Sequence, residues 1–584
     1  MAAPMDLFQQ AHCVTMKFYV VSALVTAFNF HTAIVGGFQE DPRTPDVQKQ
    51  FLSYKRVTDN KADLDLYKPI RIRTEYRDIY NELTIRSHDK LITTVHKAVN
   101  KISEFLKVFP LEQPMLLKRS GCFKEWTIGP NKGKCFSVKK YYQNEICGDS
   151  YRIPDNHLDG LSIWNQTYPE PLQEVFSRGP GINNTDFVLY VESMTTQSCG
   201  FSGTSSVLAY AKVCQVDQHD RPIAGYINLC PQELEKTSSQ KLYMGMIHEL
   251  FHTLGFSKDH LNYFKKCFIE DGNLECRPFN LVKVKEVSGT FRLVTPAVRR
   301  EAQIHFGCYN EKKFGAPLDR MYNTTSSHWD SRLMYGSIMA PSIGMPQFTF
   351  IDSITLAVFE DSGWYRVDYS HADTYMWGRG IGCSSRGEFC SVNEDSVCRN
   401  NSRGCHFLHK NKAWCEVDEH SICGIYHTNE GNDCTIQLET EYVEEIYGTS
   451  SACFVSNLTK ENVDKNFITS GRCYQYSCSK DRNLKVKVQR SQWMECPFGN
   501  FINVPGYNGY IRCPSNKDII CPETHPFKTT TTFTERNTDN VIHYTTDVPR
   551  LNQKKNINET SSGSDLDLFD YLVLAMLIFL YVIK

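Results

Sequence analysis

The sequence predicts a mixed α+β fold that ends in a disulfide-rich region, and three observations support this prediction. Apolar residues recur at helical spacing between Met244 and Leu254 with no proline among them, which predicts a helix. Residues 186–192 are rich in β-forming side chains and read as a largely buried strand. From Cys383 to Cys521 cysteines follow one another closely without long apolar periodicities, so disulfides must supply much of the stability there.

Residues 1–36 are predicted to be a leader that contains a signal peptide. Its apolar core, residues 18–30, has the length and the basic flank of a signal-peptide h-region and is short for a membrane span. Because a polar stretch precedes this core, translation from Met16 is an alternative to translation from the first methionine. Residues 37–65 are polar and charged, and we expect a short pro-segment or linker there.

Two further helices are expected on either side of the metal motif described below. Leu91 to Leu106 shows helical apolar spacing and is followed by Pro110, so this helix should end there and pack on the sheet. Asp352 is placed to cap a helix that runs to about Asp361, and Gly363 ends it.

The helix around residue 248 carries a potential metal site. His248 and His252 are one turn apart, so their imidazoles lie on the same face and can bind one zinc ion. Glu249, beside the first histidine, is placed to act as general base for a metal-activated water, which predicts peptide-bond hydrolysis. The alternative is an amphipathic helix with incidental histidines. Gly255 argues against it, because a glycine there lets the chain leave the helix in a left-handed conformation and turn sharply.

The third ligand does not follow in the short zinc-protease pattern, because Lys258 stands where that pattern has a histidine. Much further along, His328 precedes Met339-Ala340-Pro341. This arrangement resembles the leishmanolysin (invadolysin) family of surface metalloproteases, in which a long insertion separates the second and third histidine ligands and a Met-Ala-Pro turn follows.

Other segments strengthen the resemblance, which covers roughly residues 66 to 525. These landmarks keep the family's order along the chain and are residues 146–149, 184–191, 359–365, 376–378 and 473–478. The resemblance implies a metzincin-like catalytic domain, with a first part at residues 66–260. An inserted subdomain with the third ligand and the methionine turn follows at 261–380, and a cysteine-rich domain at 381–525.

The resemblance also implies the roles of individual residues. His248, His252 and His328 would bind one Zn²⁺ ion. Glu249 would be the catalytic base, while Gly255 and Met339 would support the site, Met339 as a hydrophobic floor beneath the metal. The substrates would be extracellular proteins or peptides. A cysteine in the propeptide often blocks the zinc in this family, but no cysteine lies between Cys13 and Cys122.

Alternatives to this ligand set lie in the insertion. Either His260 or His305 would replace His328 if the alignment with the family were shifted. Glu301 and Asp330 are interpreted as solvated charges and not as catalytic groups, and a short helix is expected from Glu301 to Phe306.

Composition indicates a secretory protein. The chain has 64 Lys and Arg residues and 66 Asp and Glu residues, so it has no overall positive charge that would favour binding to nucleic acid. The chain has 23 cysteines, and one of them, Cys13, precedes the apolar leader. The number of the others is even, which predicts that they form disulfides in an oxidising compartment. A cytosolic zinc-ribbon protein is the alternative, but paired Cys-x-x-Cys knuckles are absent. Six glycosylation sequons fit secretion: Asn165, Asn183, Asn323, Asn400, Asn457 and Asn558.

The C-terminal end of the sequence predicts attachment to a membrane. Residues 526–564 form a Thr- and Ser-rich stalk that cannot bury a core. Residues 565–584 are a short apolar run after the small residues 561–564, which is typical of a GPI-attachment signal. A single membrane span is the alternative, although Asp567 and Asp570 would be costly in lipid. The whole sequence thus predicts a cell-surface zinc endopeptidase. The alternative is a catalytically silent adhesion or decoy protein on the same scaffold.

Overall fold

The computed structural model describes residues 48–523, except 53, 55–65, 78–82, 200–206, 271–272, 287–288, 322–323, 384–389, 391–396, 400–401, 418–422, 437–443 and 461–467. Contacts divide the chain into one compact unit that ends at Cys521 and a second unit from Pro522 onward. The predicted signal peptide, stalk and C-terminal apolar run lie outside the described residues. Within the described part, no helix is long and apolar enough to cross a membrane.

A five-stranded sheet forms the centre of the N-terminal half, in the order β1-β12-β13-β11-β3. Its strands are β1 (Gln48–Gln50), β3 (Ile72–Tyr76), β11 (Phe187–Glu192), β12 (Ala209–Asp217) and β13 (Pro222–Leu229). The pairs β1–β12, β11–β13 and β11–β3 are parallel, and β12 and β13 are antiparallel. Strand β12 is therefore the outermost long strand, and β1 covers only its C-terminal end.

Strand β11 confirms the buried strand expected at residues 186–192, because every one of its residues is buried. Phe187, Leu189 and Val191 belong to the large core on one face of the sheet. Val188 and Tyr190 belong to a second core on the other face. A strand that alternates between two apolar layers explains the lack of polar alternation in its sequence.

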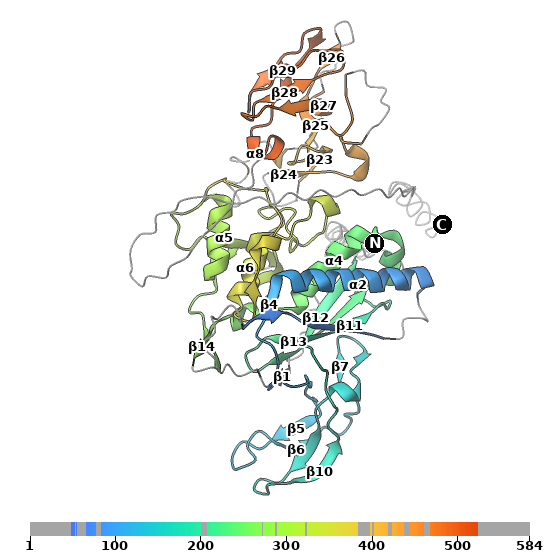
Figure 1. The fold of residues 1–584 in the computed structure, drawn as a ribbon, viewed down its shortest axis with the longest axis vertical. Helices are drawn as coiled ribbons and strands as arrows, with labels where there is room; N and C mark the ends of the chain where they lie inside the picture. The colour runs from blue at the N-terminus through green and yellow to red at the C-terminus, as the bar shows by residue number, and fades with distance from the viewer. Residues whose placement is uncertain are drawn as a thin grey trace, which may run out of the picture. The chain divides into compact units, whose positions relative to one another are not determined.

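Two helices lie on the same face of this sheet, α2 (Ile85–Phe105) and α4 (Ser239–Thr253), and they contact each other (Figure 1). Thr84 caps α2 by accepting a hydrogen bond from the backbone of Ser87, so the helix begins earlier than its apolar pattern predicted. The short helix α3 (Pro231–Lys236) precedes α4. Since α4 contacts β12 and β13, it is held against the antiparallel edge of the sheet.

Between α4 and the third histidine the chain forms its own strands and helix. The hairpin of β14 (Lys265–Glu270) and β15 (Asn273–Pro278) comes first. A four-stranded sheet follows, built from β16 (Lys283–Lys285), β17 (Phe291–Leu293), β18 (Ala316–Met321) and β19 (Thr324–Trp329).

Helix α5 (Pro296–Phe306) lies between β17 and β18, and the helix expected from Glu301 is its second half. Helix α6 (Ser353–Asp361) packs against α5. Asp352 caps α6, and Gly363 follows it with a positive φ of 80°, so both predictions for this helix are confirmed. The side chain of Asp361 in turn accepts from the first backbone amides of α5.

The remaining strands are short. Before the cysteine-rich region they are β2 (Lys68–Pro69), β4 (Leu106–Val108), β5 (Cys122–Glu125), β6 (Cys135–Val138), β7 (Ile146–Cys147), β8 (Tyr151–Arg152), β9 (Leu161–Trp164), β10 (Pro171–Phe176) and β20 (Arg366–Val367). The C-terminal part is a set of small antiparallel sheets. One contains β21 (Val397–Cys398), β22 (Arg403–Cys405), β23 (Lys412–Glu416) and β24 (Gly424–His427). A six-stranded sheet contains β25 (Ser451–Ser456), β27 (Ser470–Cys478), β28 (Leu484–Lys487), β29 (Met494–Glu495), β30 (Phe501–Ile502) and β32 (Ile511–Arg512). The strands β26 (Thr459–Lys460) and β31 (Tyr507–Asn508) and the helix α8 (Lys517–Ile520) complete it.

Disulfides pair all the cysteines from Cys122 to Cys521, as their even number predicted. The bonds are 122–135, 147–214, 199–230, 267–276, 308–383, 390–423, 398–415, 405–453, 434–473, 478–521 and 496–513. The bond from Cys308 to Cys383 ties the insertion to the start of the cysteine-rich region. The predicted mixed α+β class with many disulfides is confirmed.

Candidate metal centre

Helix α4 carries the two histidines of the motif, of which His248 is buried and His252 is partly exposed. Ser238 caps the helix by accepting from the amide of Lys241 at 3.3 Å. His248 is fully buried and Glu249 is 1% exposed, because α4 lies between the sheet and the later part of the chain. Such burial of polar side chains on one helix is costly unless they have partners, which points to a functional site.

The third histidine comes from the end of β19. His328 is 4% exposed, and its neighbour Trp329 is fully buried in the large core. The Trp329 indole donates to the hydroxyl of Thr355 at 2.8 Å, and its amide donates to the carbonyl of Met339 at 2.9 Å. These contacts fix the end of β19, and with it the position of His328.

The three imidazoles converge through the same ring nitrogen. The Nε2 atoms of His248 and His252 are 3.0 Å apart, and the Nε2 of His328 lies 3.2 Å from each. Tetrahedral zinc with ligands at about 2.0–2.1 Å places neighbouring ligand atoms about 3.3 Å apart. The residues therefore fit a three-histidine zinc site. No other group of three potential ligands occurs among the described residues.

The opposite ring nitrogens of the first two histidines are also fixed. His248 Nδ1 donates to the carbonyl of Ile338 at 2.6 Å, and His252 Nδ1 donates to the carbonyl of Phe256 at 2.7 Å. A carbonyl can only accept, so each Nδ1 carries the proton and each Nε2 presents a lone pair. This is the tautomer that a metal ligand needs.

Electrostatics favours the neutral, metal-binding form of the rings. Burial, with the neighbouring imidazoles adding to it, lowers the pKa of His248 well below its usual value. Burial and then His252 lower the pKa of His328 in the same direction. Both rings are thus unprotonated at neutral pH without any metal, so binding a cation costs no proton release from them.

Comparisons with known proteins agree with this geometry. Residues 173–424 and 422–525 match the leishmanolysin family, peptidase M8. A ciliated left-right organizer metallopeptidase of Danio rerio is 35% identical over 499 residues, which cover 81% of this chain and 78% of the relative. The protein of the same name from Xenopus laevis is 35% identical over 494 residues, covering 81% of this chain and 66% of the relative. A leishmanolysin-like peptidase of Drosophila melanogaster is 32% identical over 385 residues, covering 58% and 52%.

The chain belongs to the leishmanolysin family of metallopeptidases. The resemblance inferred from the motifs is therefore confirmed.

In this leishmanolysin-family chain the turn after β19 is held by a buried carboxylate. Asp352, which caps α6, accepts from the hydroxyl of Ser337 at 2.6 Å and from the hydroxyl of Thr355 at 2.8 Å. Ser337 directly precedes Ile338, whose carbonyl accepts from His248. Asp352 therefore connects α6 to His248 through one side chain and one turn.

From its position before an apolar run, Asp352 is predicted only to cap a helix. An acidic residue before an apolar run is typical of any helix cap, so the sequence around Asp352 does not predict its link to His248. The sequence around Ser337 does not predict this link either.

Gly255 lies where the chain leaves α4. Its φ is +119°, and a Cβ there would lie 2.6 Å from the ring of Trp364. The next residue, Phe256, supplies the carbonyl for His252. The turn thus needs glycine both for its conformation and for space, and it orients His252.

The other residues singled out in the sequence occupy distinct places. Met339 is fully buried, and its carbonyl holds Trp329. His305 donates to the carbonyl of Trp377 at 2.8 Å. His260 is buried, and its ring lies 6.3 Å from that of Trp364, centroid to centroid. Neither His260 nor His305 belongs to the three-histidine group.

The interpretation of Asp330 as a solvated charge is wrong. Asp330 is 1% exposed, and its Oδ1 accepts from the amides of Arg332 and Leu333 at 3.0 Å each. It shapes the turn directly after His328 and Trp329. Sequence alone could not distinguish this role, because an aspartate that caps a turn and one in solvent have the same neighbours along the chain.

Proposed function

We propose that this chain is a zinc-dependent endopeptidase whose ligands are His248, His252 and His328 and whose general base is Glu249. The observation that carries the proposal is the convergence of three Nε2 atoms within 3.2 Å, next to a buried glutamate on the same helix. Family membership supports it, because two of the matched relatives are named as metallopeptidases and the third as a leishmanolysin-like peptidase.

The proposed chemistry divides between the metal and the protein. A zinc ion held by neutral imidazoles supplies Lewis acidity for the substrate carbonyl and for the attacking water. Glu249 would take a proton from that water and pass it to the leaving amine. The carbonyls of Ile338 and Phe256 hold two of the imidazoles in the metal-binding tautomer. Gly255 and Met339 would maintain the turns that carry these acceptors.

The test of this proposal is the variant Glu249→Gln, which keeps the size of the buried side chain. It should retain zinc and lose about 10²–10⁴-fold in cleavage of a quenched peptide, because only the base is removed. Glu301→Gln on α5 is the matched control and should behave as wild type, since Glu301 is partly exposed and pairs with Arg300. Equal activity of Glu249→Gln and wild type would refute the role of Glu249.

A silent adhesion or decoy protein is the competing function. It predicts no cleavage by the wild type, and adhesion that survives both a chelator and Glu249→Gln. The complete three-histidine group and the retained Glu249 favour the peptidase, because a silent protein has no need to bury these polar groups together.

The disulfides indicate a secretory or extracellular protein. We propose in addition that the chain is glycosylated and carries a GPI anchor on one of residues 561–564, so that its substrates are extracellular proteins or peptides. Among the described sequons, Asn183 is exposed and best placed for a glycan. Treatment of expressing cells with a phosphatidylinositol-specific phospholipase should release the protein. Retention after this treatment, with a hydrophobic C-terminal peptide still present by mass spectrometry, would favour a membrane span.

A further inference from the structure

The described part of the N-terminal segment is built into the central sheet. Strand β1 pairs in parallel with the outer edge of β12, with Gln48 opposite Gln215 and Gln50 opposite Asp217. The Lys49 ammonium pairs with Asp220 at 2.7 Å. These residues belong to the stretch in which the sequence led us to expect a short pro-segment or linker.

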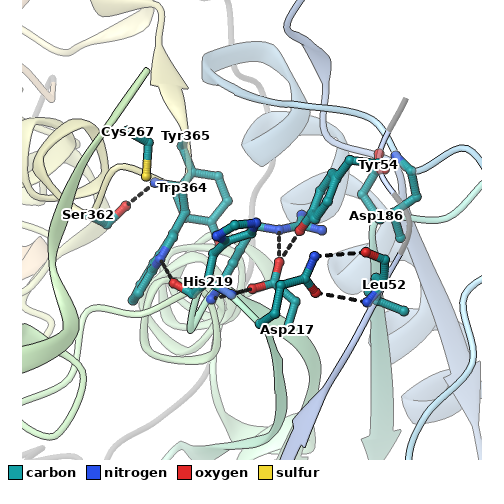
Figure 2. Close-up of polar contacts among 12 residues, drawn as sticks. Leu52, Tyr54, Asp186, Asp217, His219, Cys267, Ser362, Trp364 and Tyr365 are labelled. Carbon is teal, nitrogen blue, oxygen red and sulfur yellow. Dashed lines mark hydrogen bonds and ion pairs between the residues drawn. The ribbon is translucent and has the colours of Figure 1, made fainter. Parts of the chain in front are cut away.

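The pairing continues past the end of the strand. The Leu52 amide donates to the side-chain oxygen of Gln218 at 2.8 Å, and the Gln218 amide donates back to the Leu52 carbonyl at 2.8 Å (Figure 2). The side chain of Gln218 thus replaces the backbone of a strand residue. Both backbone hydrogen-bonding groups of Leu52 are satisfied by it.

Tyr54 then anchors the segment. Its hydroxyl donates to Asp217 (Figure 2). Its ring lies 5.9 Å from that of Phe109 and 5.7 Å from that of His219, centroid to centroid. Burial raises the pKa of Tyr54 well above its usual value, so the hydroxyl stays protonated and remains a donor. An isolated bridge to Leu111 fixes the backbone at the same place.

The group that receives Tyr54 is a buried ion pair. Asp217 is fully buried and Arg221 is 3% exposed. The Arg221 Nε donates to Asp217 at 3.2 Å, while its two terminal amino groups have no hydrogen-bond partner. They border a cavity of about 10 Å³ that Tyr54 and Trp364 also line, which has room for about one water molecule. Without Tyr54 this ion pair would lose a charge-assisted hydrogen bond and face a larger hole, which is costly for buried charges.

The rest of the outer edge of β12 has no strand partner within the part of the chain that the structure describes. No described strand pairs with it between Ala209 and Cys214, and residues 211–214 are partly exposed. Leu208, just before β12, packs on Gly245 of α4, one turn before His248. The open edge therefore begins beside the metal helix and ends at β1. An unpaired edge of this kind can take up an extended peptide by strand addition.

We propose that residues 48–54 are a resident strand, that is, a strand that stays bound to the folded protein when the chain is cut within residues 55–65. This strand also limits the edge of β12 that can bind a peptide, because it occupies the edge from Gln215 onward. An extended substrate would then pair with β12 only between Ala209 and Cys214. The first half stands on the contacts of the segment alone, and the second half rests on the proposed peptidase function.

The first half is tested with a specific protease site placed within residues 56–62 of the full chain. After cleavage, the N-terminal fragment should co-elute with the body on gel filtration. Tyr54→Ala should release the fragment and lower the melting temperature by roughly 2–5 °C. Tyr141→Ala is the control, because Tyr141 is 84% exposed. Release of the wild-type fragment with an unchanged melting temperature would overturn the proposal.

The second half is tested with quenched peptides lengthened one residue at a time on either side of the cleaved bond. In the uncut protein kcat/KM should stop rising at a shorter peptide length than in cut Tyr54→Ala protein that has lost its fragment. Each further pair of backbone hydrogen bonds should add about 2–10-fold in the fragment-free protein. Identical length dependence in the two proteins would overturn the second half. Absence of cleavage in both would overturn it together with the proposed function, whereas co-elution would still support the resident strand.

Discussion

At the scale of single residues, the metal centre depends on acceptors as much as on ligands. His248 and His252 could be predicted from the sequence, because helical spacing alone places them on one face. His328 lies 76 residues from His252 and required the resemblance to a known family. The carbonyls of Ile338 and Phe256 could not be predicted, since every residue carries a carbonyl and only the folded turns aim these two.

The link from Asp352 to His248 gives a prediction at this scale. Asp352→Asn should weaken zinc binding about 10–100-fold, because the turn that presents the Ile338 carbonyl loses its acceptor for Ser337. Competition with a chromogenic chelator measures this affinity without any peptide substrate. Ser337→Ala should show a smaller loss in the same direction.

Asp368→Asn is the matched control for this experiment. Asp368 also caps a short helix, by accepting from Ser370, and its ion-pair partner is Lys107, which is not part of the turn. Wild-type zinc affinity in Asp352→Asn, or an equal loss in Asp368→Asn, would contradict the proposed link.

At the scale of elements, the turn after α4 joins the metal helix to the later chain. The glycine at this turn could be recognised in the sequence, because it closely follows the second histidine and residues with a Cβ rarely adopt a φ as large as the +119° found here. The approach of Trp364 to Gly255 was not, since the two residues meet only when α6 has packed.

Two substitutions separate these two demands on the turn. Gly255→Ala should lower stability by roughly 2–4 kcal/mol, from backbone strain and from overlap with Trp364. Gly133 also has a positive φ, +80° against +119° at Gly255, but nothing lies within 4 Å of the methyl that Gly133→Ala adds, so this substitution should cost only about 1 kcal/mol. Thermal denaturation followed by circular dichroism compares the two. Equal effects would show that the contact with Trp364 does not constrain the turn.

At the scale of the whole molecule, the mixed fold class and the presence of disulfides could be predicted, because composition and cysteine number report on them directly. The pairing of the cysteines could not. Cys308 bonds to Cys383 across 75 residues, and Cys405 bonds to Cys453 across a sheet boundary, so only the folded chain brings them together.

The stability of the folded protein should fall in acid, because buried histidines occur outside the three-histidine group as well as within it. Burial lowers the pKa of His260 and of His305 to about 4. In the unfolded chain their pKa is about 6.5, so between these values the unfolded state binds more protons. The stabilising contribution is complete above about pH 6.5 and is lost as the pH falls towards 4.

Melting temperature measured from pH 8 to pH 4 tests this dependence. His305→Phe keeps an aromatic ring against Tyr375, on which His305 stacks, but removes the titrating group. Its melting temperature should fall less steeply with acid than that of the wild type. An unchanged slope would mean that His305 does not contribute to the acid sensitivity.

The zinc content of the purified protein and of its His328→Ala variant tests the central claim most directly. Three converging imidazoles predict about one zinc ion per chain in the wild type, and loss of most of that zinc in the variant after dialysis against a weak chelator. A His328→Ala protein that keeps a full equivalent of zinc, or a wild type that cleaves peptides without any metal, would contradict it.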